Sequence, residues 1–132
     1  MNKGKSNKSY FGLKFIATGN ETGGKYFLSE TIIPSGDSGP PIHSHSKEDE
    51  SFFVQSGKLT FNVNGKEFEL NKGEFLNIEK GEKHTWRNDS DKDAVVLVTF
   101  APAGIENMFV ELDEDISKIK EVGLKFGTEF EL

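Results

Sequence analysis

The order of apolar and polar residues along the chain predicts a succession of short β-strands. Apolar and polar side chains alternate in most of these segments, which is the period of a strand with one buried face. The predicted strands cover residues 10–17, 26–33, 43–45, 50–55, 58–64, 66–70, 74–78, 84–88 and 94–100. Turn signals separate them, among them the breaker-rich run 34–41 and the hairpin dipeptide Asn64-Gly65. About eight or nine strands at this spacing predict an all-β sandwich or barrel.

The last predicted strand and the residues after it depart from this pattern. Residues 94–100 are apolar at almost every position, which predicts a strand buried on both faces. Between positions 105 and 119 the apolar residues recur with helical spacing. The acidic run 113–115 is expected to begin a helix, and Gly123 is expected to cap the end of this region. Residues 124–132 alternate again, which predicts an extended segment docked on the barrel.

The length of 132 residues fits one domain with a hydrophobic core of its own. Only 34% of the residues are hydrophobic, but 12 phenylalanines concentrate this content in large side chains. Residues 1–9 are polar and predict a flexible N-terminal tail. Residues 10–132 are expected to form the single domain, with a helical tail over 104–123 inside it.

The composition excludes several classes of function. The formal charge of −6 argues against nucleic acids and anionic membrane surfaces as partners, because both are bound by clustered lysine and arginine. The absence of cysteine excludes disulfides, thiolate metal ligands and a cysteine nucleophile. No apolar window approaches the ~20 residues that span a bilayer, and no secretory signal is expected. These features predict a cytoplasmic protein that acts on or binds a small molecule.

Three histidines and one glutamate are the candidate functional residues. His43 and His45 are two positions apart, so an extended backbone directs both side chains to the same side. Glu50 begins the apolar run that follows and has the parity of an inward-facing residue, and His84 is the only remaining histidine. Three imidazoles and one carboxylate suit a divalent transition metal such as Mn, Fe, Co, Ni, Cu or Zn. These residue types do not indicate which of these metals is bound.

The spacing of these residues resembles the two conserved motifs of the cupin superfamily. The positions that match are His43, His45, Glu50 and Gly57 for the first motif, and Gly73, Gly81, His84 and Asn88 for the second. Two departures concern the shape of turns, because the leading glycine falls one residue early at Gly36 and Glu79 replaces the usual proline. The C-terminal region resembles that of small single-domain cupins similar to quercetin dioxygenase.

The resemblance implies a double-stranded β-helix, a small barrel with a metal ion near its centre. It also implies that the metal ligands are His43, His45, Glu50 and His84. It does not imply one reaction, since cupins include dioxygenases, decarboxylases, isomerases, epimerases and non-catalytic binding proteins. Four protein ligands would leave about two positions open on an octahedral metal, enough for a bidentate substrate or for a substrate and dioxygen.

Several aromatic and aliphatic residues are candidates for the lining of a substrate pocket. Trp86 has the parity of His84 and is expected to face the barrel interior, as is Asn88, which is expected to secure its turn. The candidates for an apolar pocket wall are Phe52, Val54, Phe61 and Val63. Ordinary core packing is the alternative interpretation for these four residues and for Trp86.

The function expected from these residues is that of a metal-dependent, dioxygenase-like enzyme acting on a small aromatic or enol-type substrate. Glu50 would alternate between metal ligand and proton acceptor. One alternative is a non-catalytic module that binds a small ligand. Another is a cupin isomerase or decarboxylase, although a carboxylate substrate needs a nearby cation and the only arginine, Arg87, is expected to point outward. A homodimer is expected, because residues 94–100 and the first strands carry apolar residues on both faces.

Overall fold

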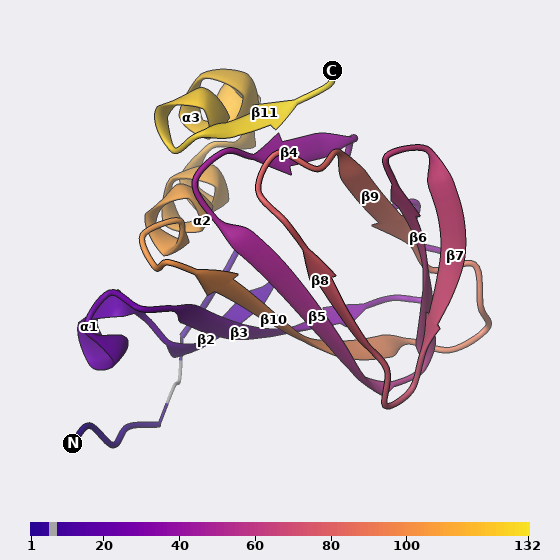
Figure 1. Ribbon diagram of the computed structural model, residues 1–132, viewed down its shortest axis with the longest axis horizontal. Helices are drawn as coiled ribbons and strands as arrows, with labels where there is room; N and C mark the ends of the chain where they lie inside the picture. Colours follow the sequence, from indigo (N-terminus) through magenta and orange to yellow (C-terminus); the bar gives the residue numbers. More distant parts are fainter. Residues whose placement is uncertain (6–7) are drawn as a thin grey trace.

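Two antiparallel β-sheets form the framework of the computed structural model, which describes residues 1–5 and 8–132 (Figure 1). The six-stranded sheet contains, in spatial order, β1 (Ser9–Tyr10), β2 (Leu13–Ala17), β3 (Phe27–Ile33), β10 (Ala94–Ala101), β5 (Asp49–Ser56) and β8 (Phe75–Ile78). The five-stranded sheet contains β11 (Thr128–Phe130), β4 (His43–His45), β9 (His84–Arg87), β6 (Lys58–Val63) and β7 (Lys66–Asn71). The chain passes repeatedly from one sheet to the other, so residues distant in sequence meet inside the barrel.

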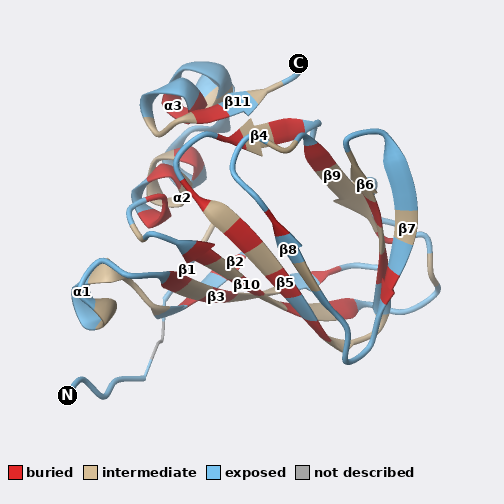
Figure 2. Ribbon diagram, in the orientation of Figure 1, coloured by how far each residue is buried: buried red, intermediate tan, exposed pale blue. Residues whose placement is uncertain are grey.

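The predicted strands are confirmed, with ends that shift by one or two residues. The first predicted strand is divided into β1 and β2, and β11 is added near the C-terminus. Figure 2 shows buried and less buried residues alternating along β5, as the period of two requires. The hairpin between β6 and β7 also has the predicted backbone, since φ is 52° at Asn64 and 85° at Gly65.

Phenylalanine side chains fill much of the space between the sheets. Phe52 and Phe61, from opposite sheets, pack edge to face with their ring centroids 4.9 Å apart. Phe15 and Phe27 make a similar contact at 4.7 Å. Such pairs contribute more than their buried area alone. A chain of moderate hydrophobic content therefore still builds a continuous core.

The helical region differs from the prediction in three respects. The helices are α1 (Gly19–Thr22), α2 (Glu106–Glu114), the 3-10 helix η1 (Ile116–Lys118) and α3 (Ile119–Lys125). The acidic run 113–115 does not begin one helix, because Asp113 and Glu114 end α2 and only Asp115 caps η1, accepting a hydrogen bond from the Ser117 amide. The predicted cap at Gly123 is wrong, since this residue lies inside α3. Extended structure over residues 124–132 is limited to β11.

Close packing explains the glycine at position 123. A Cβ atom there would lie 2.8 Å from the ring of Phe130 and from the carbonyl oxygen of Thr128. Only glycine allows α3 to approach β11 so closely. The residue therefore serves tertiary packing rather than helix termination.

Strand β10 is buried on one face only, which corrects the prediction for residues 94–100. Its inward residues are buried, whereas Val95, Leu97 and Thr99 on the outer face are only half-buried. Neighbouring strands on either side cover its edges, but no described helix lies over this face (Figure 1). The predicted N-terminal tail contains residues 6 and 7, which lie outside the described residues, and Ser9 already belongs to β1.

Candidate metal centre

The four candidate ligands come from both sheets and meet between them. His43 and His45 lie on β4 with buried side chains, and His84 lies directly opposite His43 on the neighbouring strand β9. Glu50 lies on β5 of the other sheet and is also buried. One ligand atom from each residue lies within 4.8 Å of the others. This spacing fits ligands at about 2 Å from a single ion placed between them.

The outer nitrogen of each imidazole is held by a neighbouring group. The Nδ1–H of His43 donates to the carbonyl oxygen of Pro41 at 2.9 Å. The Nδ1–H of His84 donates to the main-chain carbonyl oxygen of Glu82 at the same distance. Nδ1 of His45 is hydrogen-bonded to the hydroxyl of Thr128 at 2.8 Å. Such partners fix the orientation of metal-binding imidazoles, and here they direct every Nε2 toward the centre.

The contacts of Glu50 require either a proton or a metal ion at this centre. Because Nδ1 of His84 carries the proton donated to Glu82, Nε2 of a neutral ring presents a lone pair. This atom lies 3.0 Å from Oε1 of Glu50, which also presents lone pairs. Nε2 of His45 is 3.1 Å from the same oxygen, yet it is buried without a hydrogen-bond partner. Either a proton or a metal ion must lie among these atoms, and the donor set fits a transition metal.

The pKa values in the metal-free site follow from the same contacts. Burial raises the pKa of Glu50, but the adjacent His45 and His84 more than offset this and lower it to about 2. Burial lowers the pKa of His84, but its hydrogen bond to Glu50 and the charge of Glu50 raise it by a larger amount, so the net shift is upward. Burial and then the charge of His84 lower the pKa of His43 to about 4. Near neutral pH these pKa values favour a charged Glu50 and a neutral His43, while the contact with Glu50 stabilises the protonated form of His84.

A cavity of about 280 Å³ lies beside the cluster. His43, His45 and Glu50 form part of its wall, so three of the four candidate ligands are accessible from it. Val98 and Phe100 of β10 continue the wall with apolar surface. A metal ion held by the cluster would therefore face a space large enough for a small organic molecule.

The first and last parts of the chain close the cavity. The side chains that α2 contributes are Met108, Phe109 and Leu112. Phe130 of β11 lies over His43, with ring centroids 5.4 Å apart. Phe11, in the turn between β1 and β2, is held by a hydrogen bond of 2.7 Å from its amide to Asp113 of α2. The alternation of residues 124–132 predicted that the last segment docks on the barrel, but nothing local indicated that any of these segments borders a cavity.

Trp86 lines the cavity, as its parity predicted. It is the only tryptophan of the chain, and its ring centroid lies 5.8 Å from that of His43. The other candidates for the pocket wall are not among the cavity-lining residues: Phe52, Val54 and Phe61 are fully buried in the core, and Val63 packs against it. The structure thus gives these four the alternative role of core packing.

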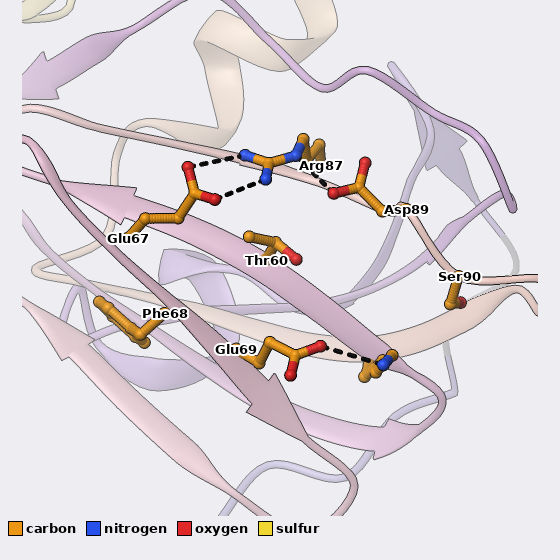
Figure 3. A pocket seen from close by; sticks show the side chains of 8 residues that line it. Thr60, Glu67, Phe68, Glu69, Arg87, Asp89 and Ser90 are labelled. Carbon is orange, nitrogen blue, oxygen red and sulfur yellow. Dashed lines mark hydrogen bonds and ion pairs between the residues drawn. The ribbon is translucent and has the colours of Figure 1, made fainter.

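Two polar residues near the site have structural roles. Asn88 is fully buried, and its side-chain amide donates to the carbonyl oxygens of Ile33 and Lys92, which secures the turn after β9 as expected. Arg87 points outward, as expected, and forms ion pairs with Glu67 and Asp89 (Figure 3). Neither residue lines the cavity.

Comparison with known protein families identifies the family to which the sequence belongs. Residues 29–100, more than half of the chain, match the family model of the cupin domain. The chain belongs to the cupin family. The match includes His43, His45, Glu50 and His84, so the cupin motifs coincide with the cluster that the structure assembles.

Two relatives of this cupin are named as an oxidoreductase and a dioxygenase. A probable oxidoreductase of Hypocrea virens is 29% identical over 89 residues, covering 65% of this chain and 41% of that protein. Quercetin 2,3-dioxygenase of Bacillus subtilis is 33% identical over 86 residues, covering 64% of this chain and 25% of that enzyme. This cupin thus spans less than half the length of either relative.

Solved structures confirm the fold as a double-stranded β-helix with a short helical region near the C-terminus. A predicted oxalate decarboxylase of Thermotoga maritima has a TM-score of 0.64 at 22% identity, covering 68% of this cupin and 78% of that chain. A cupin protein of Bacteroides fragilis has a TM-score of 0.55 at 30% identity, covering 61% and 68%. Within the described residues, none of the helices is both long and apolar enough to traverse a membrane.

Proposed function

We propose that this cupin binds one divalent transition metal through His43, His45, Glu50 and His84 and acts as a dioxygenase-like enzyme. Its substrate would be a small aromatic or enol-type molecule. The observation that carries the proposal is the convergence of three anchored imidazoles and one carboxylate beside an apolar cavity. The similarity to an oxidoreductase and to quercetin 2,3-dioxygenase supports the reaction class.

In this proposal the imidazoles bind the metal and Glu50 accepts a proton. The imidazoles hold the ion, because their outer nitrogens are fixed by Pro41, Glu82 and Thr128. A bound transition metal supplies Lewis acidity, which lowers the pKa of a substrate hydroxyl. Glu50 faces the cavity with Oε1 engaged by the imidazoles, while among the described residues no hydrogen bond reaches Oε2. That second oxygen is available to accept the proton of the substrate hydroxyl.

The charge of the cavity favours an uncharged substrate. None of the described residues that line it is a lysine or an arginine. Arg87 cannot serve, because Glu67 and Asp89 hold its guanidinium on the outer face of the five-stranded sheet (Figure 3). A carboxylate or phosphate substrate would depend on the metal alone for a counter-charge. The isomerase and decarboxylase alternatives are therefore less well supported than the oxygenase.

The first experiment is elemental analysis of the purified protein beside a His45→Ala variant. About one equivalent of Fe, Mn, Ni, Cu or Co in the wild type, and its loss in the variant, is the expected result. The fluorescence of Trp86 gives a second readout, since a bound paramagnetic ion near His43 should quench the only tryptophan of the chain. Absence of any metal after reconstitution, with no quenching, would overturn the metal site.

Oxygen consumption then tests the reaction class. The metal-loaded protein should consume dioxygen with hydroxylated aromatic or enolisable diketone compounds, and the His45→Ala variant should not. Turnover that persists without dioxygen would contradict the oxygenase and favour isomerase or decarboxylase chemistry. Ligand-induced thermal stabilisation without turnover across the panel would favour the non-catalytic binding module.

A further inference from the structure

The turn between β1 and β2 has an unfavourable residue at its first position. Tyr10 pairs with Leu13, so Phe11 and Gly12 form a two-residue hairpin turn. The angle φ is 52° at Phe11 and 79° at Gly12, and a type I′ turn requires positive φ at both positions. Such turns favour asparagine or glycine, whereas a bulky side chain is strained there. The turn itself therefore does not explain the phenylalanine.

The hairpin between β6 and β7 shows which residue a turn of this kind ordinarily favours. Its central residues Asn64 and Gly65 have φ of 52° and 85°, close to the values in the β1–β2 turn. Asparagine stands there at the position that Phe11 has in the first hairpin. Of these two residues, only Phe11 lines the cavity. The strain at Phe11 thus coincides with a place on the cavity wall, and strained residues cluster at functional sites.

A row of ring contacts places Phe11 at the solvent-facing end of the cavity wall. The ring centroid of Phe100 lies 5.4 Å from that of His45, and the centroid of Phe109 lies 5.7 Å from that of Phe100. Phe11 continues the row at 6.4 Å from Phe109. All four rings line the cavity. His45 and Phe100 are buried, whereas Phe109 and Phe11 are only half-buried, so burial decreases along the row away from the candidate metal ligand.

Two side chains from other elements hold this turn against the barrel. The amide of Phe11 donates to Oδ1 of Asp113 in α2 at 2.7 Å. The hydroxyl of Thr31 in β3 donates to the carbonyl oxygen of Gly12 at 2.9 Å. Helix α2 also supplies Phe109, on which the ring of Phe11 packs. The position of the Phe11 ring therefore depends on α2, although the two elements lie at opposite ends of the chain.

We infer that Phe11 is a specificity-determining residue at the mouth of the cavity and that Asp113 positions it. The ring narrows the passage to the metal centre and sets an upper limit on the size of the molecule that enters. The cavity of about 280 Å³ lies at the lower end of the roughly 300–1,000 Å³ of pockets for drug-sized ligands, which suits an aromatic molecule with a single ring. That this molecule is a substrate rests on the proposed function, whereas the control of access does not.

Quenching of Trp86 fluorescence by acrylamide, in chelator-treated protein, tests the control of access. Trp86 lines the cavity and is the only tryptophan, so this small neutral quencher reports on the passage. Phe11→Asn removes the ring and supplies the residue that the turn favours. It should raise the quenching rate constant by about two- to fivefold, because the fraction of molecules with an open mouth increases. The wild type should show the lower constant.

Phe75→Asn is the matched control for this variant. It makes the same change at a 63% exposed phenylalanine that is not among the described residues lining the cavity. Its quenching rate constant should equal that of the wild type. Equal quenching in the wild type and in Phe11→Asn would overturn the inference, whatever metal or reaction the protein has. An equal rise in Phe75→Asn would also overturn it.

Two variants of Asp113 test its positioning role. Asp113→Asn keeps an oxygen that accepts the hydrogen bond from the Phe11 amide, so quenching should stay at the wild-type level. Asp113→Leu removes the acceptor and should be quenched like Phe11→Asn. Circular dichroism and thermal unfolding establish that each variant is folded. A lower thermal stability of Asp113→Leu without any change in quenching would contradict the positioning role.

The size limit is tested by the binding of two aromatic probes to the purified protein. Isothermal titration calorimetry gives the dissociation constants of catechol and of the larger 3-hydroxyflavone. Phe11→Asn should lower the dissociation constant of the flavonol by about tenfold and change that of catechol less than about twofold. An equal change for both probes would overturn the size limit. Binding without oxygen consumption would count against the proposed reaction only, since these measurements require no turnover.

Discussion

At the scale of single residues, the metal centre depends on which nitrogen of each histidine is occupied. The main-chain carbonyls of Pro41 and Glu82 can only accept hydrogen bonds, so they fix the proton of two rings on Nδ1. The Nε2 atoms are consequently the ones that reach Glu50. A metal ion would replace a proton in this arrangement, which links metal affinity to pH.

Two neighbouring buried glutamates provide a direct test of the ligand assignment. Glu50 belongs to the cluster, whereas Glu48 is equally buried but does not belong to it. We expect Glu50→Gln to weaken metal binding by at least about 100-fold, because the amide lacks the charge that balances the ion. Glu48→Gln should bind metal within about twofold of the wild type. Titration of Trp86 fluorescence measures both, and equal losses in the two variants would contradict the assignment.

The pKa of His43 predicts how the metal-free protein responds to acid. Its pKa is lowered from 6.5 to about 4, so the unfolded chain binds a proton more readily than the folded one between these values. Stability should therefore fall as pH decreases from 6.5 to about 4, by about 3 kcal/mol from this residue. Denaturant unfolding of chelator-treated protein measures this, with His43→Gln as comparison. A variant with the same pH dependence as the wild type would exclude His43 as the cause.

At the scale of elements, the three histidines of the candidate metal centre lie where β4, β9 and β11 pair with one another. β4 supplies two histidines, β9 supplies the third, and β11 pairs with β4 so that Thr128 lies opposite His45. The loop before β4 is equally constrained: Gly39 has φ of +80°, and a Cβ atom there would overlap the carbonyl oxygen of Trp86. The orientation of His45 therefore depends on β11, which contributes no ligand.

Removing the hydroxyl of Thr128 should weaken the metal site without changing the ligands. Thr128→Val keeps the size of the side chain but removes the hydrogen bond to Nδ1 of His45, so metal affinity should fall about 10–100-fold. Thr60→Val, on the outer face of β6 (Figure 3), is the control and should bind metal normally. Elemental analysis and the quenching of Trp86 fluorescence measure the metal affinity of the two variants. An unchanged affinity in Thr128→Val would show that this hydrogen bond does not orient His45.

At the scale of the whole molecule, the candidate metal site connects the two sheets. The histidines come from the five-stranded sheet and Glu50 from the six-stranded sheet, so an ion bound by all four would hold the barrel together. A ligand that binds only the folded state shifts the folding equilibrium toward it.

Metal loading should consequently raise the thermal stability of the wild type. At a free metal concentration of 100 times the dissociation constant, the gain is about 2.7 kcal/mol, which corresponds to several degrees in Tm. A chelator should reverse the shift, and the His45→Ala variant should show none. Differential scanning calorimetry measures it. An equal shift in the variant would mean that the metal binds elsewhere.

The sequence by itself determined the strand positions and the candidate ligand residues, because both depend on local patterns. The period of two requires neither a partner nor a sheet order, and the spacing of His43, His45, Glu50 and His84 is itself a motif. Helix ends were less predictable: Gly123 has the residue type of a cap, but its packing against Phe130 decides its role.

Only the tertiary structure decided which residues border the cavity and which fill the core. Phe52, Val54 and Phe61 have the same inward parity as Trp86, yet only Trp86 reaches the cavity. Phe11 and Phe130 come from opposite ends of the chain and also line the cavity. Phe130 reaches it because β11 pairs with the distant strand β4, and Phe11 is held there by the hydrogen bond of its amide to Asp113. Parity selects a side of a strand, but the order of strands decides what lies on that side.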